Sequence, residues 1–349
     1  MENPTMRMRC LSLGCLVLVC EMAIFAHSVM ADEPKPTLRA GIIGLDTSHA
    51  IAFTKTLNSD APKPELSGVR VVAAYPQGSV DIESSVSRVP GYTTQVEKLG
   101  VEIVDSIPDL LEKVDVVLLE SNDGRPHLEQ ALPVILAGKP MFIDKPAAGS
   151  LEDVIAIFEL AKRHGAPVFS SSSLRFGPAV QEIRGGSIGV VQGADAYSPC
   201  SLETTHPDLF WYGIHGVELL YTAMGPGCET VRREATPNVD LVVGRWPDSR
   251  IGTFRGIRAG KSGYGGQAFG SKAIASLGSF AGYEPLVVEI VRFFKTGKPP
   301  VEASETIELY AFMQAADTSK ANAGAAVSIP DTIRAAREKA LEKIVALGE

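Results

Sequence analysis

The sequence LRAGIIGLDTSHA, residues 38–50, passes from an apolar run into polar residues within one short turn. The apolar part, residues 38–45, is typical of a strand that is buried on both faces. The residues that follow, 46–48, are of the types that cap the N-terminus of a helix, and we expect that helix to pass through Phe53 and Leu57. A strand that leads directly into a helix is the first unit of a dinucleotide-binding fold, in which the turn faces a diphosphate.

Predicted strands and helices alternate as far as residue 171. Runs of β-branched and other apolar residues predict further strands at residues 69–75, 101–104, 114–119, 141–144 and 168–169. Helices are predicted at residues 108–112, 127–136 and 151–164. Because the strands are apolar on both faces, we expect a parallel sheet with helices on both sides. Residues 32–171 are therefore predicted to form a doubly wound dinucleotide-binding domain of Rossmann type.

The composition changes from residue 172 onward, where glycine is frequent and the β-like stretches are short. Such stretches lie at residues 189–192, 239–243 and 252–258. Helices are predicted at residues 214–223, 285–296 and 303–322 and, as an amphipathic tail, at 330–347. We therefore expect an α/β chain whose residues 172–349 form a C-terminal α+β domain with an open antiparallel sheet.

The composition indicates a globular protein of two domains. Its 349 residues are 45% hydrophobic and 21% charged, which is enough apolar material for a buried core. Acidic residues outnumber basic ones, 41 to 33, and no basic run stands out, so nucleic acid and anionic lipid are unfavourable partners. The five cysteines are too few for a disulfide scaffold.

The N-terminus has the pattern of a secretory signal peptide. Arg7 and Arg9 precede an apolar run, and Val29 and Ala31 occupy the −3 and −1 positions of a cleavage site. We expect residues 1–31 to be removed by cleavage after Ala31. The protein is then periplasmic or secreted and has no membrane attachment.

Two cysteines, Cys200 and Cys228, lie outside the predicted signal peptide. An oxidising compartment allows them to form a disulfide. Two separate buried thiols are the other reading, because the sequence gives no distance between them.

The turn after the first predicted strand departs from the glycine pattern of dinucleotide sites. With Gly44 as the first glycine of G-x-G-x-x-G, the second position is Asp46 and the third is His49. A carboxylate is unfavourable beside a diphosphate, whereas Thr47 and Ser48 offer hydroxyl donors. The turn alone is therefore weak evidence for a cofactor.

The end of the second predicted strand also lacks an expected residue. An NAD site usually carries Asp or Glu there to hold the ribose hydroxyls, but this sequence has Tyr75 followed by a proline. No arginine stands beside it for the additional phosphate of NADP. The choice between NAD and NADP is therefore open.

The most specific pattern in the chain follows the fourth predicted strand. That strand ends near Asn122, His127 opens the next helix, and Asp144-Lys145-Pro146 follows another strand after an Ala-Gly-Lys. In order and spacing this resembles the Gfo/Idh/MocA family (glucose–fructose oxidoreductase, inositol dehydrogenase and relatives), with Asp144 in place of a glutamate. The resemblance implies that Lys145 lies beside the nicotinamide and the substrate hydroxyl, where it polarises the reacting oxygen or acts as an acid or base.

The resemblance extends into the second half of the chain. A Leu-Arg-Phe-Gly-Pro stretch resembles the family's crossover between domains, and His215 matches a catalytic histidine. The family's carboxylate four residues earlier is Trp211 here, and we expect His206 to lie nearby in its place. The resemblance implies a site between the domains where Lys145, Arg175 and His215 converge. Substrate contacts are implied for three residues: Arg175, His206 and Tyr212.

The candidate cofactor-binding residues lie at the ends of predicted strands or in the matched pattern. They are Gly44, Asp46, Thr47, Ser48, His49, Tyr75, Ser121, Asn122, His127, Asp144 and Pro146. The cofactor that the resemblance implies for them is NAD or NADP.

These features together favour an NAD(P)-dependent oxidoreductase that acts on a hydroxyl of a sugar or cyclitol. Two alternatives stay open: a carbohydrate lyase or glycosidase that holds NAD tightly, and a ligand-binding relative that has lost nicotinamide binding. The candidates Glu203, His206, Asp208 and His215 lack the spacing of a metal site, so we expect no metal. In the family the open sheet often forms a contact between subunits, so the resemblance also implies a homo-oligomer.

Overall fold

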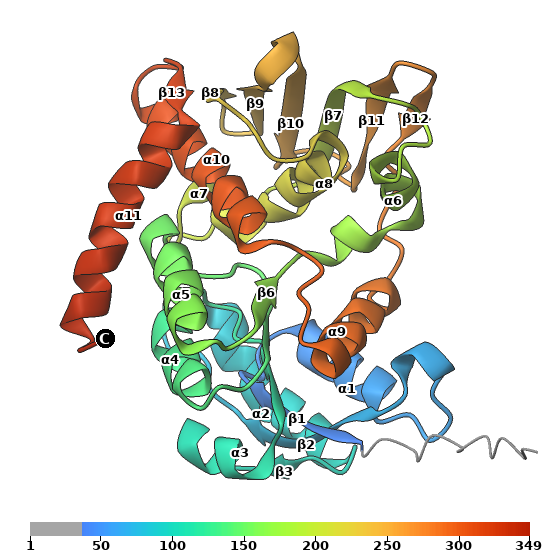
Figure 1. Cartoon of the computed structure of the whole chain (residues 1–349), viewed down its shortest axis with the longest axis vertical. Helices are drawn as coiled ribbons and strands as arrows, with labels where there is room; N and C mark the ends of the chain where they lie inside the picture. The colour runs from blue at the N-terminus through green and yellow to red at the C-terminus, as the bar shows by residue number, and fades with distance from the viewer. Residues whose placement is uncertain (1–36) are drawn as a thin grey trace, which may run out of the picture. The chain divides into compact units, whose positions relative to one another are not determined.

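The first domain is built on a parallel sheet. The computed structural model describes residues 37–349, in which six strands pair in the order β3-β2-β1-β4-β5-β6 (Figure 1). They are β1 (Leu38–Ile43), β2 (Val69–Tyr75), β3 (Glu102–Ile103), β4 (Val116–Leu119), β5 (Met141–Ile143) and β6 (Val168–Ser170). Every neighbouring pair is parallel, which confirms the predicted Rossmann-type sheet. The strand order reverses between β1 and β4, and open α/β sheets bind ligands at the carboxyl ends beside such a reversal.

The helices of the first domain connect these strands. They are α1 (Ser48–Leu57), α2 (Glu83–Glu97), α3 (Ile107–Lys113), α4 (His127–Leu136) and α5 (Leu151–His164), with a 3-10 turn η1 (Pro64–Leu66). The predictions of α4 and α5 are confirmed with the same bounds. The sequence does not predict α2, because only Ser85 and Val96 of this helix are buried and no apolar stripe marks it.

The second domain contains a sheet of seven strands in the order β12-β11-β7-β10-β9-β8-β13. They are β7 (Val191–Pro199), β8 (Thr230–Ala235), β9 (Val239–Arg245), β10 (Ile251–Ile257), β11 (Gly265–Gly270), β12 (Ile274–Ser276) and β13 (Val327–Ser328). The neighbours are antiparallel except β7 and β10, so the predicted antiparallel sheet is in fact mixed. The parallel pair arises because a long crossover, which contains two helices and two strands, separates β7 from β10.

Two helices from the end of the chain return to the first domain. The remaining helices are α6 (Pro178–Arg184), α7 (Asp208–Trp211), α8 (Ile214–Met224), α9 (Glu284–Thr296), α10 (Ala303–Ala321) and α11 (Ile329–Ala346), with 3-10 turns η2 (Ser173–Phe176) and η3 (Pro247–Ser249). Helix α9 shares a core cluster with β1, β2 and α1, and α11 lies along α5 (Figure 1). The apolar residues of both domains are thereby joined across their boundary.

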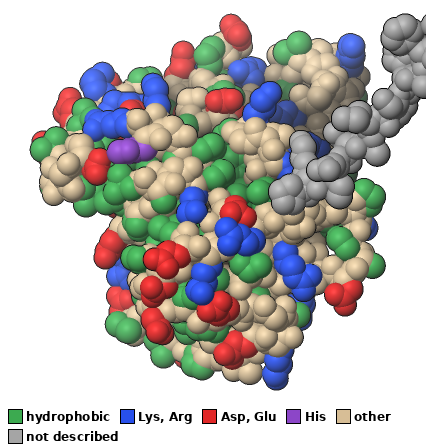
Figure 2. All heavy atoms as spheres, turned by 60° about the horizontal axis from the view of Figure 1, so that its bottom comes forward, with side chains coloured by type: hydrophobic (Ala, Val, Ile, Leu, Met, Phe, Trp, Pro, Cys, Tyr) green, Lys and Arg blue, Asp and Glu red, His purple; other side chains and the backbone are tan. Residues whose placement is uncertain are grey.

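The charged side chains on the surface form no large basic patch on the face that is drawn in Figure 2. On the face drawn in Figure 2, acidic and basic side chains are intermingled, unlike the basic stripe of a nucleic-acid-binding face.

Cys200 and Cys228 are both buried free thiols. Within residues 37–349, none of the helices is both long and apolar enough for a membrane span. The predicted signal peptide and its cleavage site after Ala31 lie outside the described residues.

Candidate active site

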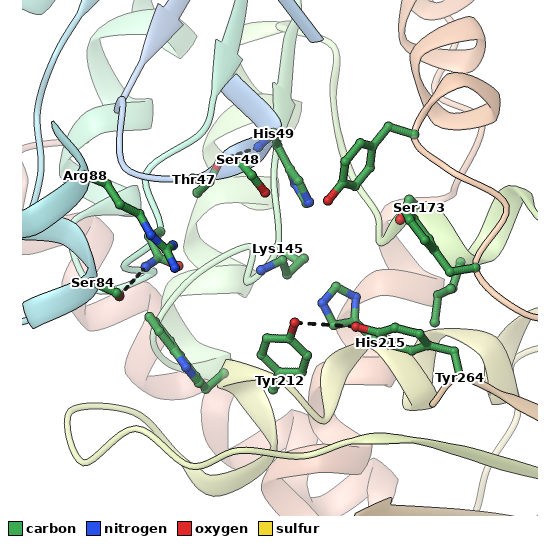
Figure 3. A pocket seen from close by; sticks show the side chains of 15 residues that line it. Thr47, Ser48, His49, Ser84, Arg88, Lys145, Ser173, Tyr212, His215 and Tyr264 are labelled. Atoms are coloured by element: carbon green, nitrogen blue, oxygen red, sulfur yellow. Dashed lines mark hydrogen bonds between the residues drawn. The ribbon is translucent and has the colours of Figure 1, made fainter. Parts of the chain in front are cut away.

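A pocket of about 350 Å³ lies at the carboxyl ends of the first sheet and is bounded by segments of the second domain (Figure 3). Its walls are polar and aromatic, and the described residues that line it include two cationic side chains and no carboxylate. The lining residues are Thr47, Ser48, His49, Ser84, Arg88, Asn122, Lys145, Ser173, Leu174, Trp211, Tyr212, His215, Tyr264, Phe280 and Tyr283. Such a lining favours a polar ligand that carries hydroxyl groups or negative charge.

The turn after β1 depends on a glycine. Gly44 has a φ of +91°, and a Cβ atom there would lie 2.5 Å from the main-chain nitrogen of Ser121. The residues that follow cap α1, since the Thr47 hydroxyl accepts a hydrogen bond from the main-chain N–H of His49 at 3.2 Å. Thr47, and not Asp46, is therefore the N-cap, and the positive end of α1 borders the pocket.

Asp46 is turned away from the pocket. Its Oδ1 accepts a hydrogen bond from the main-chain N–H of Asn122 at 2.8 Å, and its Oδ2 accepts one from the Ser85 hydroxyl at 2.6 Å. Burial raises the pKa of Asp46 above its usual value, although both hydrogen bonds favour the charged form. The expected repulsion of a diphosphate is reduced, because this carboxyl group is not part of the pocket lining.

The end of the pocket near α1 has the donors that an anion needs. Ser84 and Arg88 reach it from α2, and the Asn122 side-chain amide donates to the Ser84 hydroxyl at 3.2 Å. The Arg88 guanidinium donates to the main-chain oxygen of Asp46 at 3.3 Å, which holds it beside the turn. A guanidinium, hydroxyls and a helix N-terminus together fit the diphosphate of a dinucleotide.

The end of β2 has no such fit for a ribose. Tyr75 does not line the pocket, and the loop after it is tied to the loop after β4. The Ser79 hydroxyl donates to Asp123 at 2.6 Å, and Arg125 forms ion pairs with Asp81 at 2.7 Å and Asp123 at 2.6 Å. These carboxylates are occupied by their own partners, so the end of β2 does not distinguish NAD from NADP.

Lys145 and His215 enter the same cavity from different domains. Lys145 follows β5, and His215 lies in the first turn of α8; both side chains point into the cavity (Figure 3). The Lys145 ammonium lies 5.9 Å from the centre of the Tyr212 ring. The Nδ1 atom of His215 is 2.8 Å from the Ser172 hydroxyl. Burial, together with the charge of Lys145, holds the pKa of His215 well below its usual value, so the imidazole is neutral and can accept a proton.

Tyrosines surround His215 on the side of the second domain. The rings of Tyr212 and Tyr264 lie 5.1 Å and 5.8 Å from the imidazole, both nearly perpendicular to it. The Tyr264 hydroxyl donates to the Tyr212 hydroxyl at 3.5 Å (Figure 3). The imidazole is therefore packed on two sides, which fixes the direction of its ring.

A buried cluster of ionisable groups borders Lys145. His49 Nδ1 lies 2.6 Å from Asp144 Oδ2, and the main-chain N–H of Lys145 donates to Asp144 Oδ1 at 2.8 Å. Burial disfavours a charged Asp144, but the adjacent His49 and Lys145 hold its pKa below the usual value. Glu120, at the end of β4, is completely buried, and burial and the Asp144 charge raise its pKa well above the usual value.

The sequence of the first domain matches a known family. The model of the oxidoreductase family with an NAD-binding Rossmann fold, GFO_IDH_MocA, matches residues 38–172. Residues 38–172 are therefore similar to the NAD-binding domain of the Gfo/Idh/MocA family. The resemblance seen in the Asn122, His127 and Asp144-Lys145-Pro146 pattern is thereby confirmed for the part of the chain that carries it.

Similar proteins are known in sequence and in structure. Inositol 2-dehydrogenase of Ralstonia nicotianae is 28% identical over 143 residues, which are 40% of this chain and 37% of that protein, so the match spans little more than a third of this relative. The structure of scyllo-inositol dehydrogenase from Lactobacillus casei with NAD(H) and scyllo-inositol has a TM-score of 0.66 at 16% identity, over 84% of this chain and 99% of that one. An oxidoreductase from Agrobacterium radiobacter, in complex with NAD+, L-tartaric acid and magnesium, has the same TM-score at 14% identity and the same coverage. These structures establish the fold of both domains.

The pocket contains part of the site that is predicted from the sequence. The predicted residues that line it are Thr47, Ser48, His49, Asn122, Lys145, Tyr212 and His215. The predicted cofactor residues that do not line it are Gly44, Asp46, Tyr75, Ser121, His127, Asp144 and Pro146. Most members of the second group hold the first in position through turns and hydrogen bonds.

His127 and Ser121 illustrate this supporting role. The ring of His127 is fully buried between two main-chain oxygens, those of Ser121 at 3.0 Å and Ala147 at 3.2 Å. The Ser121 hydroxyl donates to Gln130 in α4 at 2.9 Å. His127 therefore connects the loops after β4 and β5, and the Ser121 side chain connects the first of these loops to α4. Neither residue lines the pocket.

The expectation that Arg175 joins Lys145 and His215 in the pocket also needs correction. The Arg175 side chain is buried, where it forms an ion pair with Glu218 and another with Glu305 at 2.7 Å. Arg175 does not line the pocket, because two buried carboxylates hold its guanidinium, whose Nη2 has no hydrogen-bond partner among the described residues. The ion pairs form because η2, α8 and α10 meet behind the pocket, and sequence spacing does not predict that meeting.

His206 likewise lies outside the pocket lining. Its Nε2 accepts a hydrogen bond from the main-chain N–H of Gly124 at 3.2 Å, and its side chain is fully buried. It does not take the place of the missing carboxylate beside His215, whose Nδ1 contacts the Ser172 hydroxyl instead. His206 connects the loop before α7 to the loop after β4.

Several lining residues carry no signal in the sequence. Ser84 and Arg88 lie on α2, which has no apolar stripe, and Tyr264 and Tyr283 lie in irregular segments. A glycine on each side of Tyr264 marks a turn but not a site. Glu120 belongs to none of the sequence motifs described above, and its complete burial is a property of the folded structure.

Proposed function

We propose that the protein is an NAD(P)-dependent oxidoreductase that acts on a hydroxyl of a sugar or cyclitol. The observation that carries this proposal is the presence of Lys145 and His215 in one cavity that also borders the N-terminus of α1. Membership of the first domain in an oxidoreductase family with an NAD-binding Rossmann fold supports it. The inositol dehydrogenases among the similar proteins support a polyhydroxylated substrate.

The residues at the α1 end of the cavity would hold the cofactor. Thr47, Ser48 and Arg88 offer donors to its diphosphate, and the Asn122 amide lies beside them. Nicotinamide, when bound, supplies the group that accepts or returns a hydride. The direction of the cavity, from Arg88 toward His215, then leads from the diphosphate to the reacting carbon.

Lys145 and His215 would handle the substrate oxygen. The Lys145 ammonium donates a hydrogen bond to the reacting hydroxyl and stabilises the negative charge that grows on it. In the tautomer in which Nδ1–H donates to the Ser172 hydroxyl, the neutral His215 accepts the proton of the substrate hydroxyl at Nε2. The tyrosines around His215 restrict the ring and exclude water from it.

Export of the protein is part of the proposal. Residues 1–31 act as a signal peptide, and the protein works in the periplasm or outside the cell. Free NAD is scarce there, so the protein would need a cofactor that stays tightly bound. A bound cofactor that is regenerated in each cycle would favour the alternative function, a carbohydrate lyase or glycosidase. N-terminal sequencing of protein recovered from its native compartment tests the export, and a chain that still begins at Met1 would contradict it.

The first experiment is a search for the cofactor. The purified protein is denatured, released dinucleotide is identified by mass spectrometry, and the cofactor-free form is titrated with NAD+ and NADP+ by calorimetry. Released or bound dinucleotide supports the proposal. Failure to bind either dinucleotide at millimolar concentration contradicts it and favours a ligand-binding relative without nicotinamide.

The second experiment measures turnover. NADH formation is followed with a panel of inositols and sugars, and product is analysed for substrates that react without net NADH. We expect Lys145→Met to lower kcat/KM about 100- to 1,000-fold while dinucleotide still binds. Lys162→Met, on the exposed face of α5, is the matched control and keeps full activity.

A further inference from the structure

Glu120 is buried without any partner for its carboxyl group. The side chain is inaccessible to solvent, and neither Oε1 nor Oε2 has a hydrogen-bond partner among residues 37–349. A buried carboxyl group normally accepts or donates hydrogen bonds, because its desolvation is otherwise uncompensated. The proposed hydride and proton transfers do not use Glu120, so its position requires another explanation.

Two further ligand-type side chains lie next to it. One ligand atom of His49, one of Glu120 and one of Asp144 all lie within 4.8 Å of one another, and all three residues are buried. They come from α1, the end of β4 and the end of β5, so the three adjacent central strands β1, β4 and β5 bring them together. His49 also lines the pocket, so the cluster borders the pocket through this one residue.

We propose that His49, Glu120 and Asp144 bind a divalent metal ion, with Zn²⁺ as the best match. One imidazole nitrogen and two carboxylate oxygens are ligands that Zn²⁺ accepts, and three protein ligands leave a fourth position open. Two carboxylates also balance the charge of a divalent cation in a buried site. The metal would satisfy the oxygens of Glu120 that otherwise lack a partner.

The open position of the metal would point toward the pocket. Of the three ligands, His49 is the one that reaches the lining, and it is packed against Phe53 and Tyr283 at ring distances of 5.5 Å and 4.6 Å. Lys145 is bonded through its main-chain nitrogen to Asp144. The Lys145 charge acts on both Glu120 and Asp144, so its ammonium is near the cluster. This step rests on the proposed function: a substrate oxygen held by Lys145 would then lie near the metal, which would polarise it as a Lewis acid.

The alternative occupant of the cluster is a proton. A neutral Glu120 beside a charged Asp144 needs no metal, and the hydrogen bond between His49 and Asp144 would then persist. The two occupants predict opposite results for metal binding. A metal replaces that hydrogen bond with two coordination bonds, whereas a proton leaves no metal site.

The test is a titration of the purified full chain after treatment with a chelator. Zn²⁺, Mn²⁺ and Mg²⁺ are each titrated by calorimetry, and Co²⁺ is added to follow its visible absorption as a ligand-sensitive probe. We expect one equivalent of Zn²⁺ to bind, and Glu120→Gln to lower its affinity about 100-fold or more. Glu308→Gln is the matched control, because Glu308 is a partly buried carboxylate whose partners, the main-chain N–H groups of Gly227 and Cys228, lie outside the cluster.

Two further variants keep the test decisive if Glu120→Gln does not fold. His49→Gln and Asp144→Asn each remove one ligand, and each is expected to abolish the Co²⁺ spectrum while circular dichroism stays unchanged. Absence of Zn²⁺ binding to the wild type overturns the proposal. So does binding that all three cluster variants leave unchanged, since that places the metal elsewhere. Dinucleotide binding is measured separately, so failure of the metal site and failure of the oxidoreductase proposal are distinguishable.

Discussion

The main-chain N–H of Asn122 donates a hydrogen bond of 2.8 Å to the Asp46 carboxylate, which joins the turn after β1 to the turn after β4. The second glycine of a dinucleotide turn has no side chain that could make this bond. Here Asp46 also accepts from Ser85 on α2 and thereby links three segments of the first domain. Asp46, which interrupts the glycine motif, therefore stabilises the loops that surround the pocket and acts as a structural brace.

Removal of this brace is expected to destabilise the protein. Asp46→Ala leaves the buried Asn122 N–H and Ser85 hydroxyl without their acceptor, so we expect a loss of about 1–3 kcal/mol in the free energy of unfolding. Denaturant unfolding measures it. Asp105→Ala, at an exposed position, serves as control and should change stability by less than about 0.5 kcal/mol. Equal stability of the two variants would contradict a bracing role.

Arg88 is expected to contribute to dinucleotide binding and little to stability. Its side chain borders the pocket, and its hydrogen bond to the Asp46 main chain is long at 3.3 Å. Arg88→Met should weaken NAD+ binding roughly 10- to 100-fold, which is the effect of losing one charge-assisted hydrogen bond. Calorimetry measures this against Arg334→Met, a surface control on α11. An unchanged dissociation constant would place the diphosphate elsewhere.

The activity is expected to depend on pH through His215. Burial and the charge of Lys145 lower its pKa well below the usual value of 6.5, so the imidazole is neutral and basic throughout the neutral range. For alcohol oxidation, log(kcat/KM) should therefore stay flat as pH falls toward 6.5 and decline only below it. His215→Gln should lose this decline together with most of the activity. A decline that persists in this variant would assign the titration to another group.

Arg175 is expected to act on stability rather than on substrate binding. Arg175→Met leaves Glu218 and Glu305 as buried carboxylates without this partner, and we expect a loss of about 3–5 kcal/mol in the free energy of unfolding. Arg39→Met breaks an exposed ion pair with Asp115 and should cost less than about 1 kcal/mol. The variant's KM should equal the wild-type value wherever it is folded. A raised KM at unchanged stability would restore Arg175 as a substrate residue.

Asp123 is expected to make stability sensitive to acid. Burial opposes its ionisation, but the adjacent His206, Arg125 and Ser79 side chains prevail and hold its pKa well below the usual value of 3.8. A lowered folded-state pKa stabilises the fold above pH 3.8, and that stabilisation is lost as pH falls below this value. Asp123→Asn should therefore be less stable than the wild type at pH 7. The difference between the two should shrink below pH 3.8, and a constant difference would contradict this account.

Local patterns in the sequence determined the class of fold. The apolar run at residues 38–45, the polar cap after it and the repeated strand-to-helix alternation are short-range features, and they predict the parallel sheet that forms. Lys145 could be predicted for the same reason, since it follows directly on a buried strand at the edge where such sheets bind ligands. The resemblance in spacing to the Gfo/Idh/MocA family predicted His215 as a second catalytic residue. The sequence did not show which side chain contacts this histidine.

Only the tertiary structure decided which of these residues meet. Arg175 is drawn behind the pocket by Glu218 and Glu305, and Arg88 enters it from a helix without an apolar stripe. Glu120, whose carboxyl group has no partner among residues 37–349, has no signature in the sequence. A side chain's type and its distance from a strand end are properties of the chain nearby. Its burial, and the charge of the side chains that pack against it, depend on segments that are distant in the sequence, so only the folded chain determines them.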